Sequence, residues 1–371
     1  MTSSAEHPDG SRDRSFIAMR DVREAVSELA QGLRGWLASG ACQSDSGAFY
    51  AWIDPSDGTS AYEYPEITGY ALTWFAGQPE RMPEEEAAGR RAAEWLLRRF
   101  RSGDWSARSG WDNGAAYSFD LAIISAGLVN FGRVSGHDQS FDQGLAIAAG
   151  LADQTRLAGR LTPISRRSLS ESSREPGWSN PGSAHLAKAA QCLLLAAEEG
   201  VGGADEAAVS VIQEARRLQG DDGRFITHLA NGRTMLHPHL YAVEGLWIFG
   251  SARGDLEAIS CARAGLEWAW GQQQVTGALP RFAPGTAAPA QADVTAQAVR
   301  MAVALDLTPP GFDAAVSWLC DTARGHDRGL ALPYQPASGD NHLNTWATLF
   351  GAQATQAALP DRPGPKWQTL V

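Results

Sequence analysis

The feature that most constrains this chain is a helical pair that recurs along it. Six stretches share one pattern, in which a polar residue precedes an apolar helix that is rich in Ala and Leu and often closed by Gly. The polar anchors recur at intervals of 54, 65, 54, 54 and 51 positions. Such a regular period is the signature of a repeat architecture. The anchors are Glu66, Asp120, His185, His239, Asp293 and Asn344.

A second, more amphipathic helix lies between consecutive anchors. The clearest examples are residues 21–40 and 84–103, where charges gather on one face and apolar residues recur at i, i+3, i+4 and i+7. A helix that is apolar nearly all round must be buried on every side, whereas an amphipathic helix has one wet face. Open solenoids usually carry polar terminal caps, and the sequence has no such pair. We therefore expect an all-α fold, an (α/α)6 barrel of six inner and six outer helices in a single domain.

The barrel domain is expected to span residues 16–358. Residues 1–15 lack the apolar core of a secretory signal and are expected to form a disordered tail. A polar insertion rich in Ser, Arg and Pro at about 159–180 accounts for the one long interval between anchors. Residues 359–371 are expected to form a C-terminal tail.

The composition fits a globular protein with a substantial core, since 44% of the residues are hydrophobic and 20% are charged. The formal charge of −11 argues against nucleic acid or an anionic membrane surface as the main partner. No apolar run approaches the ~20 residues that a membrane span needs. The four cysteines lie far apart without CxxC spacing, which favours a reduced, cytoplasmic protein.

Polar residues are expected to gather at one end of this barrel. If all inner helices run in the same direction, their N-termini open at one mouth, and converging polar groups in an apolar-walled pocket are the default site hypothesis. Carboxylates and histidines there suit proton transfer. The catalytic candidates are Glu66, Asp120, His239 and Asp293. The candidates for substrate binding are Tyr64, Tyr117, Trp178, His185, His237, Tyr241, Glu244, Gln297, His342, Asn344 and Trp346.

Each of these residues also has a purely structural interpretation. Asp293 and Asn344 are normal N-cap residues, and Glu66 after Pro65 suits the positive end of a helix dipole. The stretch HPHLYAVE favours function more strongly, because two histidines and a glutamate crowd within it. No metal or cofactor is expected: H-P-H is not a usual zinc pair, and the HExxH, phosphate-loop and GxSxG motifs are absent from the sequence.

Two stretches resemble known toroid families. EWAWGQQQVTGALPRF resembles the repeat turns of the squalene/hopene cyclases and protein prenyltransferases, and LHPHLYAVEGLWIF is similar to the inner helices that carry catalytic histidines in the N-acylglucosamine 2-epimerases. The same six-hairpin barrel carries unsaturated glucuronyl hydrolases and some polysaccharide lyases. The resemblance covers most of residues 21–358 and implies the toroid fold. The cyclase motif DxDD is absent, and Asp293-Val294-Thr295 replaces the zinc-binding D-x-C of the prenyltransferases, which argues against zinc.

Our leading hypothesis is an enzyme that acts on a carbohydrate or sugar-like polyol by acid–base chemistry at the barrel mouth. Epimerisation, elimination and hydrolysis stay open. His239 with Glu66 or His185 would serve proton transfer, while Asp120 and Asp293, on opposite sides of a six-fold ring, would serve glycoside hydrolysis. The alternatives are a terpenoid cyclase-like or prenyl-binding enzyme and a non-catalytic sugar-binding or scaffold protein. The expected partner is a small molecule or an oligosaccharide, and the sequence does not indicate an oligomeric state.

Overall fold

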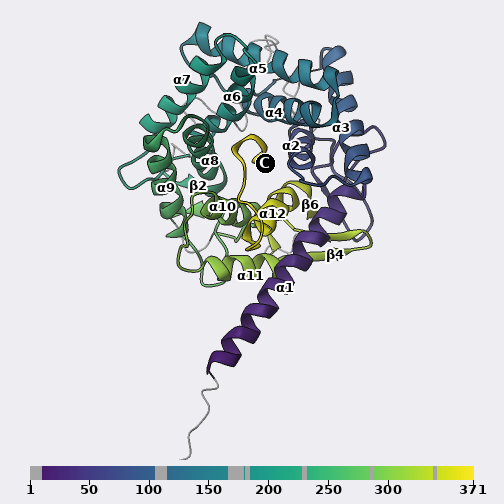
Figure 1. Ribbon diagram of the computed structural model, residues 1–371, viewed down its shortest axis with the longest axis vertical. Helices are drawn as coiled ribbons and strands as arrows, with labels where there is room; N and C mark the ends of the chain where they lie inside the picture. The colour runs from purple at the N-terminus through teal and green to yellow at the C-terminus, as the bar shows by residue number, and fades with distance from the viewer. Residues whose placement is uncertain are drawn as a thin grey trace, which may run out of the picture.

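A computed structural model describes residues 11–104, 115–165, 179, 184–227, 232–284, 288–336 and 341–371 (Figure 1). In these ranges the chain is mostly helical, and the strands form three small antiparallel pairs. The strand pairs are β1 (Trp52–Ile53) with β6 (Leu343–Asn344), β2 (Thr234–Met235) with β3 (Phe282–Ala283), and β4 (Arg324–His326) with β5 (Gly329–Ala331).

The helices form two concentric rings, which confirms the (α/α)6 toroid (Figure 1). The inner ring comprises α2 (Pro65–Ala76), α4 (Ser118–Ser135), the 3-10 helix η2 (Ala184–Ala189) continuing into α6 (Ala190–Glu198), α8 (Leu236–Arg253), α10 (Ala292–Ala304) and α12 (Thr345–Ala358). The outer ring comprises α1 (Ser11–Ala38), α3 (Pro83–Arg101), α5 (Asp138–Ala158), α7 (Ala204–Arg217), α9 (Leu256–Trp270) and α11 (Phe312–Thr322).

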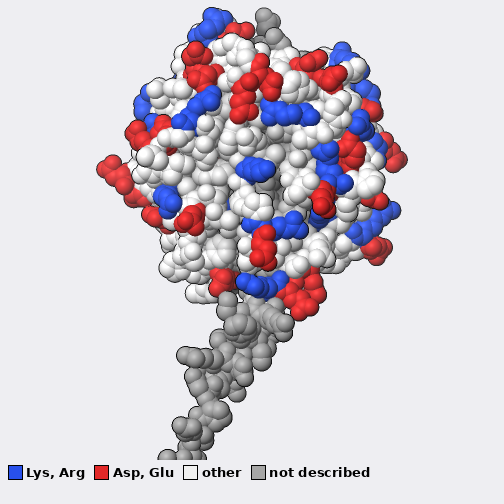
Figure 2. Space-filling view, in the orientation of Figure 1, with Lys and Arg blue, Asp and Glu red and all other residues white. Residues whose placement is uncertain are grey.

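The burial of the two kinds of helix follows their sequence patterns. Every residue of α2 is buried, whereas α3 buries Ala92, Leu96 and other apolar residues and turns most of its charges to solvent. Side chains of both charge signs are interspersed around the rim of the face shown in Figure 2, where the outer helices lie. The outer ring therefore supplies most of the wet surface, whereas the inner helices are exposed mainly at their C-terminal ends, as at Arg133 and Arg253.

The first and last repeats close the ring. Helix α12 packs against α1 and α2, and strand β6 pairs with β1 so that Asn344 lies opposite Trp52. Small residues allow the inner helices to approach closely: a methyl group on Gly127 of α4 would collide with the backbone carbonyl of Gly69 in α2. Closure buries the terminal repeats, which explains why the chain needs no polar capping helices.

Both expected tails differ from the prediction. Helix α1 begins at Ser11, so the expected N-terminal tail overlaps a helix, whose first turns extend away from the ring (Figure 1). The expected C-terminal tail instead runs to the centre of the ring, where the 3-10 helix η4 (Trp367–Thr369) contacts α2, α4, α6 and α8, and Leu370 and Val371 are fully buried. Most of the polar insertion lies outside the described residues.

Two further findings concern the chain as a whole. In the described ranges, none of the helices is both long enough and apolar enough to cross a membrane. The cysteines Cys42, Cys192, Cys261 and Cys320 are all free thiols, and the first two are buried.

Candidate functional site

The inner helices all begin at the same end of the ring, because the chain alternates between outer and inner helices (Figure 1). Side chains from different repeats meet there. The ring of Phe119 on α4 lies 5.5 Å from that of His185 on η2 and 4.7 Å from that of Tyr241 on α8. The ring of His237 on α8 lies 4.8 Å from that of Trp346 on α12. Residues far apart in the sequence therefore surround one region of the barrel.

A histidine–aspartate pair lies at the centre of this region. The Nδ1 atom of His237 is 3.1 Å from Asp293 Oδ2 and 2.8 Å from Gln297 Oε1. Gln291 also donates its side-chain amide to Asp293 Oδ2, at 3.1 Å. Asp293 is fully buried, and the side chain of His237 is 12% exposed. The pair joins the first turns of two neighbouring inner helices, α8 and α10.

The hydrogen bonds of Gln297 define the tautomer of His237. Its amide nitrogen donates to Glu244 Oε1 at 3.0 Å, because an ionised carboxylate can only accept. The amide oxygen of Gln297 therefore faces His237, and this oxygen can only accept as well. Neutral His237 must then carry its hydrogen on Nδ1. The lone pair is left on Nε2, the arrangement that a general base requires.

The Nε2 atom of His237 has no hydrogen-bond partner within the described part of the chain. Aromatic rings surround the imidazole, with centroids at 4.4 Å for Tyr241, 4.8 Å for Trp346 and 6.0 Å for Phe350. The indole nitrogen of Trp346 and Asp293 Oδ1 likewise have no partner among the residues described. Buried polar atoms without partners are rare and often mark a functional position or bound water.

Glu66 lies in the first turn of α2, close enough for its charge to act on Tyr241. Tyr64 donates its hydroxyl hydrogen to Glu66 Oε2, and the Glu66 side chain is fully buried. Burial raises the pKa values of Tyr70 and Tyr241 well above their ordinary value, and the negative charges of Glu66 and Glu244 raise them further. Glu66 is thus close to the phenol that also packs on His237.

His185 contributes hydrogen-bonding capacity and no charge. Its Nε2 atom is 2.9 Å from the hydroxyl of Ser179. Burial lowers the pKa of His185 to about 3, and the nearby His237 contributes to this shift. The His185 ring is therefore neutral at every pH at which an ordinary enzyme works. Around His237 the titratable groups are Asp293 from α10, His185 from η2 and, across Tyr241, Glu66 from α2.

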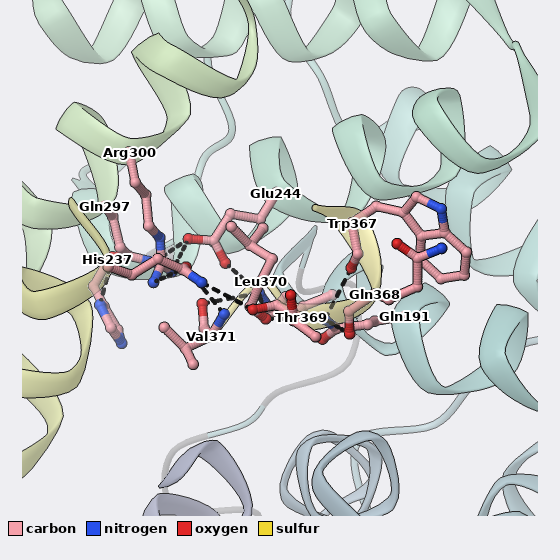
Figure 3. A network of polar contacts seen from close by, with 12 residues as sticks. Gln191, His237, Glu244, Gln297, Arg300, Trp367, Gln368, Thr369, Leu370 and Val371 are labelled. Carbon is pink, nitrogen blue, oxygen red and sulfur yellow. Dashed lines mark hydrogen bonds and ion pairs between the residues drawn. The ribbon is translucent and has the colours of Figure 1, made fainter. Parts of the chain in front are cut away.

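A layer of buried charge lies directly beneath this region (Figure 3). The carboxylate of Glu244 forms an ion pair with Lys188, whose Nζ atom is 2.9 Å from Oε2, and accepts a hydrogen bond from Arg300 Nη2 at 2.5 Å on Oε1. All three side chains are fully buried. The guanidinium of Arg300 lies 4.1 Å from the ring centroid of Phe350. Burial alone would raise the pKa of Glu244, but the two cations outweigh it and hold that pKa below its ordinary value. Glu244 and Gln297 therefore support His237 from below and are not placed to bind a substrate.

His239 occupies a different position from the one expected. Its Nδ1 atom accepts from the backbone N–H of Phe225 at 3.2 Å, and its Nε2 atom donates to the carbonyl of Gly265 at 2.8 Å. Its ring lies 4.9 Å from that of Trp268 on α9. Burial lowers the pKa of His239 to about 4. Both nitrogens are engaged by backbone groups next to the outer ring, so His237 replaces His239 as our candidate for proton transfer.

The last repeat supplies less to the site than expected. Asn344 is the N-cap of α12, and its side-chain oxygen accepts from the backbone N–H of Ala347 at 2.9 Å. The ring of His342 stacks on Trp52 with centroids 3.8 Å apart, and its Nε2 atom is 3.4 Å from Asp54 Oδ2. The capping interpretation of Asn344 therefore agrees with its geometry, and Trp346 is the residue of this repeat that contacts His237.

Three candidates remain, of which Asp120 and Tyr117 belong to the repeat of α4 and Trp178 lies outside the described residues. Asp120 is buried in the first turn of α4, on the inner helix opposite α10 (Figure 1). Tyr117 precedes the same helix and packs in a small cluster with Ala115 and Ile164. In the described ranges, no group of three or more His, Cys, Asp or Glu side chains is arranged to hold a metal ion. The metal-free site stays a prediction.

Sequence reasoning missed the buried cations and their neighbours. Lys188 and Arg300 were available as a signal, because each is a charged residue inside an otherwise apolar inner helix. A charge in such a helix is almost always paired. No comparable signal marked Tyr70, Phe350 or the buried residues 367–371. Aromatic residues in a buried helix and a short polar tail are ordinary features of a sequence.

Two open pockets among the described residues lie away from His237 and Asp293. One of about 340 Å³ sits where α2 and α12 end, beside the loop that contains Arg362 and Lys366. Another of about 250 Å³ lies against α5 and is lined by Asp153 and Gln154. Neither contains a paired acid and base, so the histidine–aspartate pair remains the better candidate for chemistry.

Solved structures with the same architecture are enzymes that act on sugars. An unsaturated glucuronyl hydrolase specific for heparin superposes with a TM-score of 0.67 at 13% identity, covering 91% of this chain and 96% of its own. The unsaturated glucuronyl hydrolase of Bacillus sp. GL1 gives 0.67 at 12%, covering 90% and 96%. A sugar epimerase from a ruminal bacterium gives 0.63 at 12%, covering 90% and 98%. At these identities the likeness establishes the toroid fold. No protein-family model matches the chain, and no curated protein does.

Proposed function

We propose that the protein is a carbohydrate-acting enzyme that moves a proton at a sugar carbon, as an epimerase or isomerase does. The observation that carries the proposal is the pair of His237 and Asp293, in which a carboxylate 3.1 Å away holds Nδ1 while Nε2 has no partner among the described residues. A neutral imidazole in this state is a base suited to neutral pH. The likeness in fold to a sugar epimerase and to unsaturated glucuronyl hydrolases supports a sugar as substrate.

His237 has the role of general base in this mechanism. Its Nε2 lone pair takes the proton from a carbon next to the carbonyl group of an open-chain sugar. The electrons of the broken C–H bond pass into the carbonyl group and give an enolate. The imidazolium that forms is stabilised by the carboxylate of Asp293, which also keeps the ring in its orientation. A proton then returns to the carbon. The face of the enolate that receives this proton decides the stereochemistry of the product.

Glu66 is the group that we assign to proton return. It belongs to α2, whereas His237 belongs to α8, and both act on Tyr241: the charge of Glu66 raises its pKa, and the His237 ring packs on its ring. A base and an acid on different walls can reach opposite faces of one carbon. The rings of Tyr241, Trp346 and Phe350 give the region apolar surfaces that can pack against the C–H faces of a sugar.

Glycoside hydrolysis with Asp120 and Asp293 fits the geometry less well. Hydrolysis by two carboxylates requires each to be available to the scissile bond or to a water. Asp293 already directs Oδ2 at His237 and receives a hydrogen bond from Gln291 on the same atom. This commitment favours a supporting role for Asp293 and proton transfer by His237.

The direct test is hydrogen exchange at carbon. The full-length protein is incubated in D2O with a panel of reducing sugars and N-acyl amino sugars, and proton NMR follows the loss of C–H signals next to the carbonyl. We expect one sugar class to exchange and to yield a new epimer or isomer. His237→Gln should slow the exchange about 10² to 10⁴-fold, the usual contribution of general acid–base catalysis. His326→Gln, on strand β4, is the matched control and should exchange normally.

Other results would redirect the assignment. Turnover of unsaturated uronyl oligosaccharides without turnover of simple sugars would favour the hydrolase chemistry of the structural neighbours. Thermal stabilisation by sugars without any turnover would favour a binding protein. Stabilisation by a prenyl diphosphate alone would favour the cyclase-like alternative.

A further inference from the structure

We propose that residues 367–371, here called the C-terminal segment, position the proton-transfer histidine from inside the barrel. The proposal deepens the proposed function, because it assigns to that site a supporting element that the sequence places far from it. The link runs from the C-terminal segment through Lys188, Glu244 and Gln297 to His237 (Figure 3).

The inner helices hold the C-terminal segment as a binding protein holds a peptide. Asn130 donates to the carbonyl of residue 368 at 2.7 Å, and Gln191 donates to those of residues 367, 368 and 370 at 3.0, 3.0 and 2.9 Å. Gln353 donates to the carbonyl of residue 369 at 2.8 Å and accepts from the N–H of Val371 at 3.1 Å. Main-chain groups along the whole segment are thus satisfied by side chains of α4, α6 and α12.

The segment also completes the coordination of a buried ammonium group. Lys188 has N–H donors only. It donates to the main-chain oxygens of Leu370 and Val371 at 3.3 and 3.2 Å and forms an ion pair with Glu244, with its Nζ atom 2.9 Å from Oε2. Among the described residues, both hydrogen-bond acceptors of the ammonium therefore come from the segment. Lys188 is fully buried, so water cannot replace them without opening the barrel. Burial already lowers the pKa of Lys188 to about 8, which leaves little margin before the ammonium is lost.

The position of Glu244 decides which way the Gln297 amide faces. While Glu244 Oε1 accepts from the amide nitrogen of Gln297, the amide oxygen faces His237 and keeps the hydrogen on Nδ1. If Lys188 withdraws, Glu244 is left with Arg300 and is free to move toward it. The Gln297 amide can then turn over and present its N–H to Nδ1. That arrangement favours the hydrogen on Nε2, and the base at the site is lost.

Histidine NMR tests this link without any substrate. Nitrogen-15 chemical shifts report the tautomer and the pKa of each histidine, the chain has 8 of them, and His237→Gln identifies the signal of interest. We expect the Nδ1–H tautomer for His237 in the full chain. Deletion of residues 367–371 should increase the Nε2–H fraction of His237 several-fold.

A second variant guards against a deletion that fails to fold. Gln191→Met removes three hydrogen bonds to the segment and touches neither Lys188 nor Glu244. We expect it to shift the tautomer in the same direction by a smaller amount. Gln78→Met, a glutamine of similar burial at the end of α2, is the matched control and should leave His237 unchanged.

If the tautomer of His237 is unchanged in folded Gln191→Met, and in the deleted chain if it folds, the proposal is overturned and the segment serves as core packing. Because the measurement needs no sugar, this failure is distinct from failure of the proposed function, which would appear as normal turnover in His237→Gln.

Discussion

The Nδ1 atom of His237 lies 3.1 Å from Oδ2 of Asp293, across the contact between helices α8 and α10. Neither residue was expected to depend on the other, since the sequence predicts a catalytic or a capping role for Asp293. The N-cap of α10 is Gln291, and Asp293 lies in the first turn. The contact gives Asp293 a third role, in which a fully buried carboxylate orients an imidazole and balances the charge that it acquires.

Replacement of Asp293 by Asn should lower turnover about 10 to 10³-fold, because the imidazolium formed in the reaction loses its counter-charge. A loss of stability of about 0.3–1 kcal/mol with normal turnover would instead identify Asp293 as a partner of the helix dipole in the first turn of α10. The measurements are the steady-state turnover and urea unfolding of the same protein.

Replacement of Glu66 by Gln separates two interpretations of the first anchor. As a proton-transfer group, Glu66 should account for about 10²-fold or more of the rate. As a partner of the helix dipole alone, it should account for about 0.3–1 kcal/mol of stability and no rate. Tyr64 can still donate to the amide oxygen of Gln, so the variant should fold normally. Asp54→Asn, on the loop after β1, is a suitable control of the same chemistry on the surface.

The architecture was predictable because its cause is local and repeated. An apolar helix followed by an amphipathic one, six times over, has few ways to bury its apolar faces. The outer helices expected over residues 21–40 and 84–103 correspond to α1 and α3, although α1 already begins at Ser11. The convergence of Glu66, His185 and Tyr241 follows from the same alternation. These features can be predicted from the direction of each helix alone, without knowing how the helix is rotated about its own axis.

The particular partners in the site were not predictable, because they depend on how each helix is rotated. His237 and His239 are two positions apart, so on a helix they point to different sides, and the sequence alone did not indicate which one faces the interior. His239 faces the outer ring and His237 faces Asp293. The insertion of residues 367–371 along the axis was hidden for a similar reason. A short polar segment shows its burial only when the glutamines that bind it are in place.

The buried charges give a ranking of stability. Glu244→Gln leaves Lys188 and Arg300 buried without a carboxylate between them, and breaking a buried ion pair in this way costs about 3–5 kcal/mol. Lys188→Met leaves Glu244 still paired with Arg300, so the remaining charge is balanced. We expect Glu244→Gln to lower the free energy of unfolding more than Lys188→Met does, measured by urea denaturation at neutral pH. The reverse order would mean that the hydrogen bonds from Lys188 to residues 370 and 371 outweigh the ion pairs.

The pH dependence of stability tests the position of His239. Its pKa is lowered to about 4 in the folded protein from an ordinary 6.5, because burial disfavours the charged ring. Between these values the unfolded chain binds a proton that the folded protein does not, so stability rises with pH through this window. The contribution is fully present above about pH 6.5 and is lost as the pH falls toward 4, to an extent of about 3 kcal/mol for a shift of this size.

In His239→Gln the amide can still donate to the carbonyl of Gly265 and has no charge to gain. The variant should therefore show a flatter fall in the free energy of unfolding between pH 6.5 and 4 than the unsubstituted chain, measured by urea denaturation at several pH values. Parallel curves for the two proteins would mean that the His239 ring gains its proton without unfolding, and that this histidine faces water.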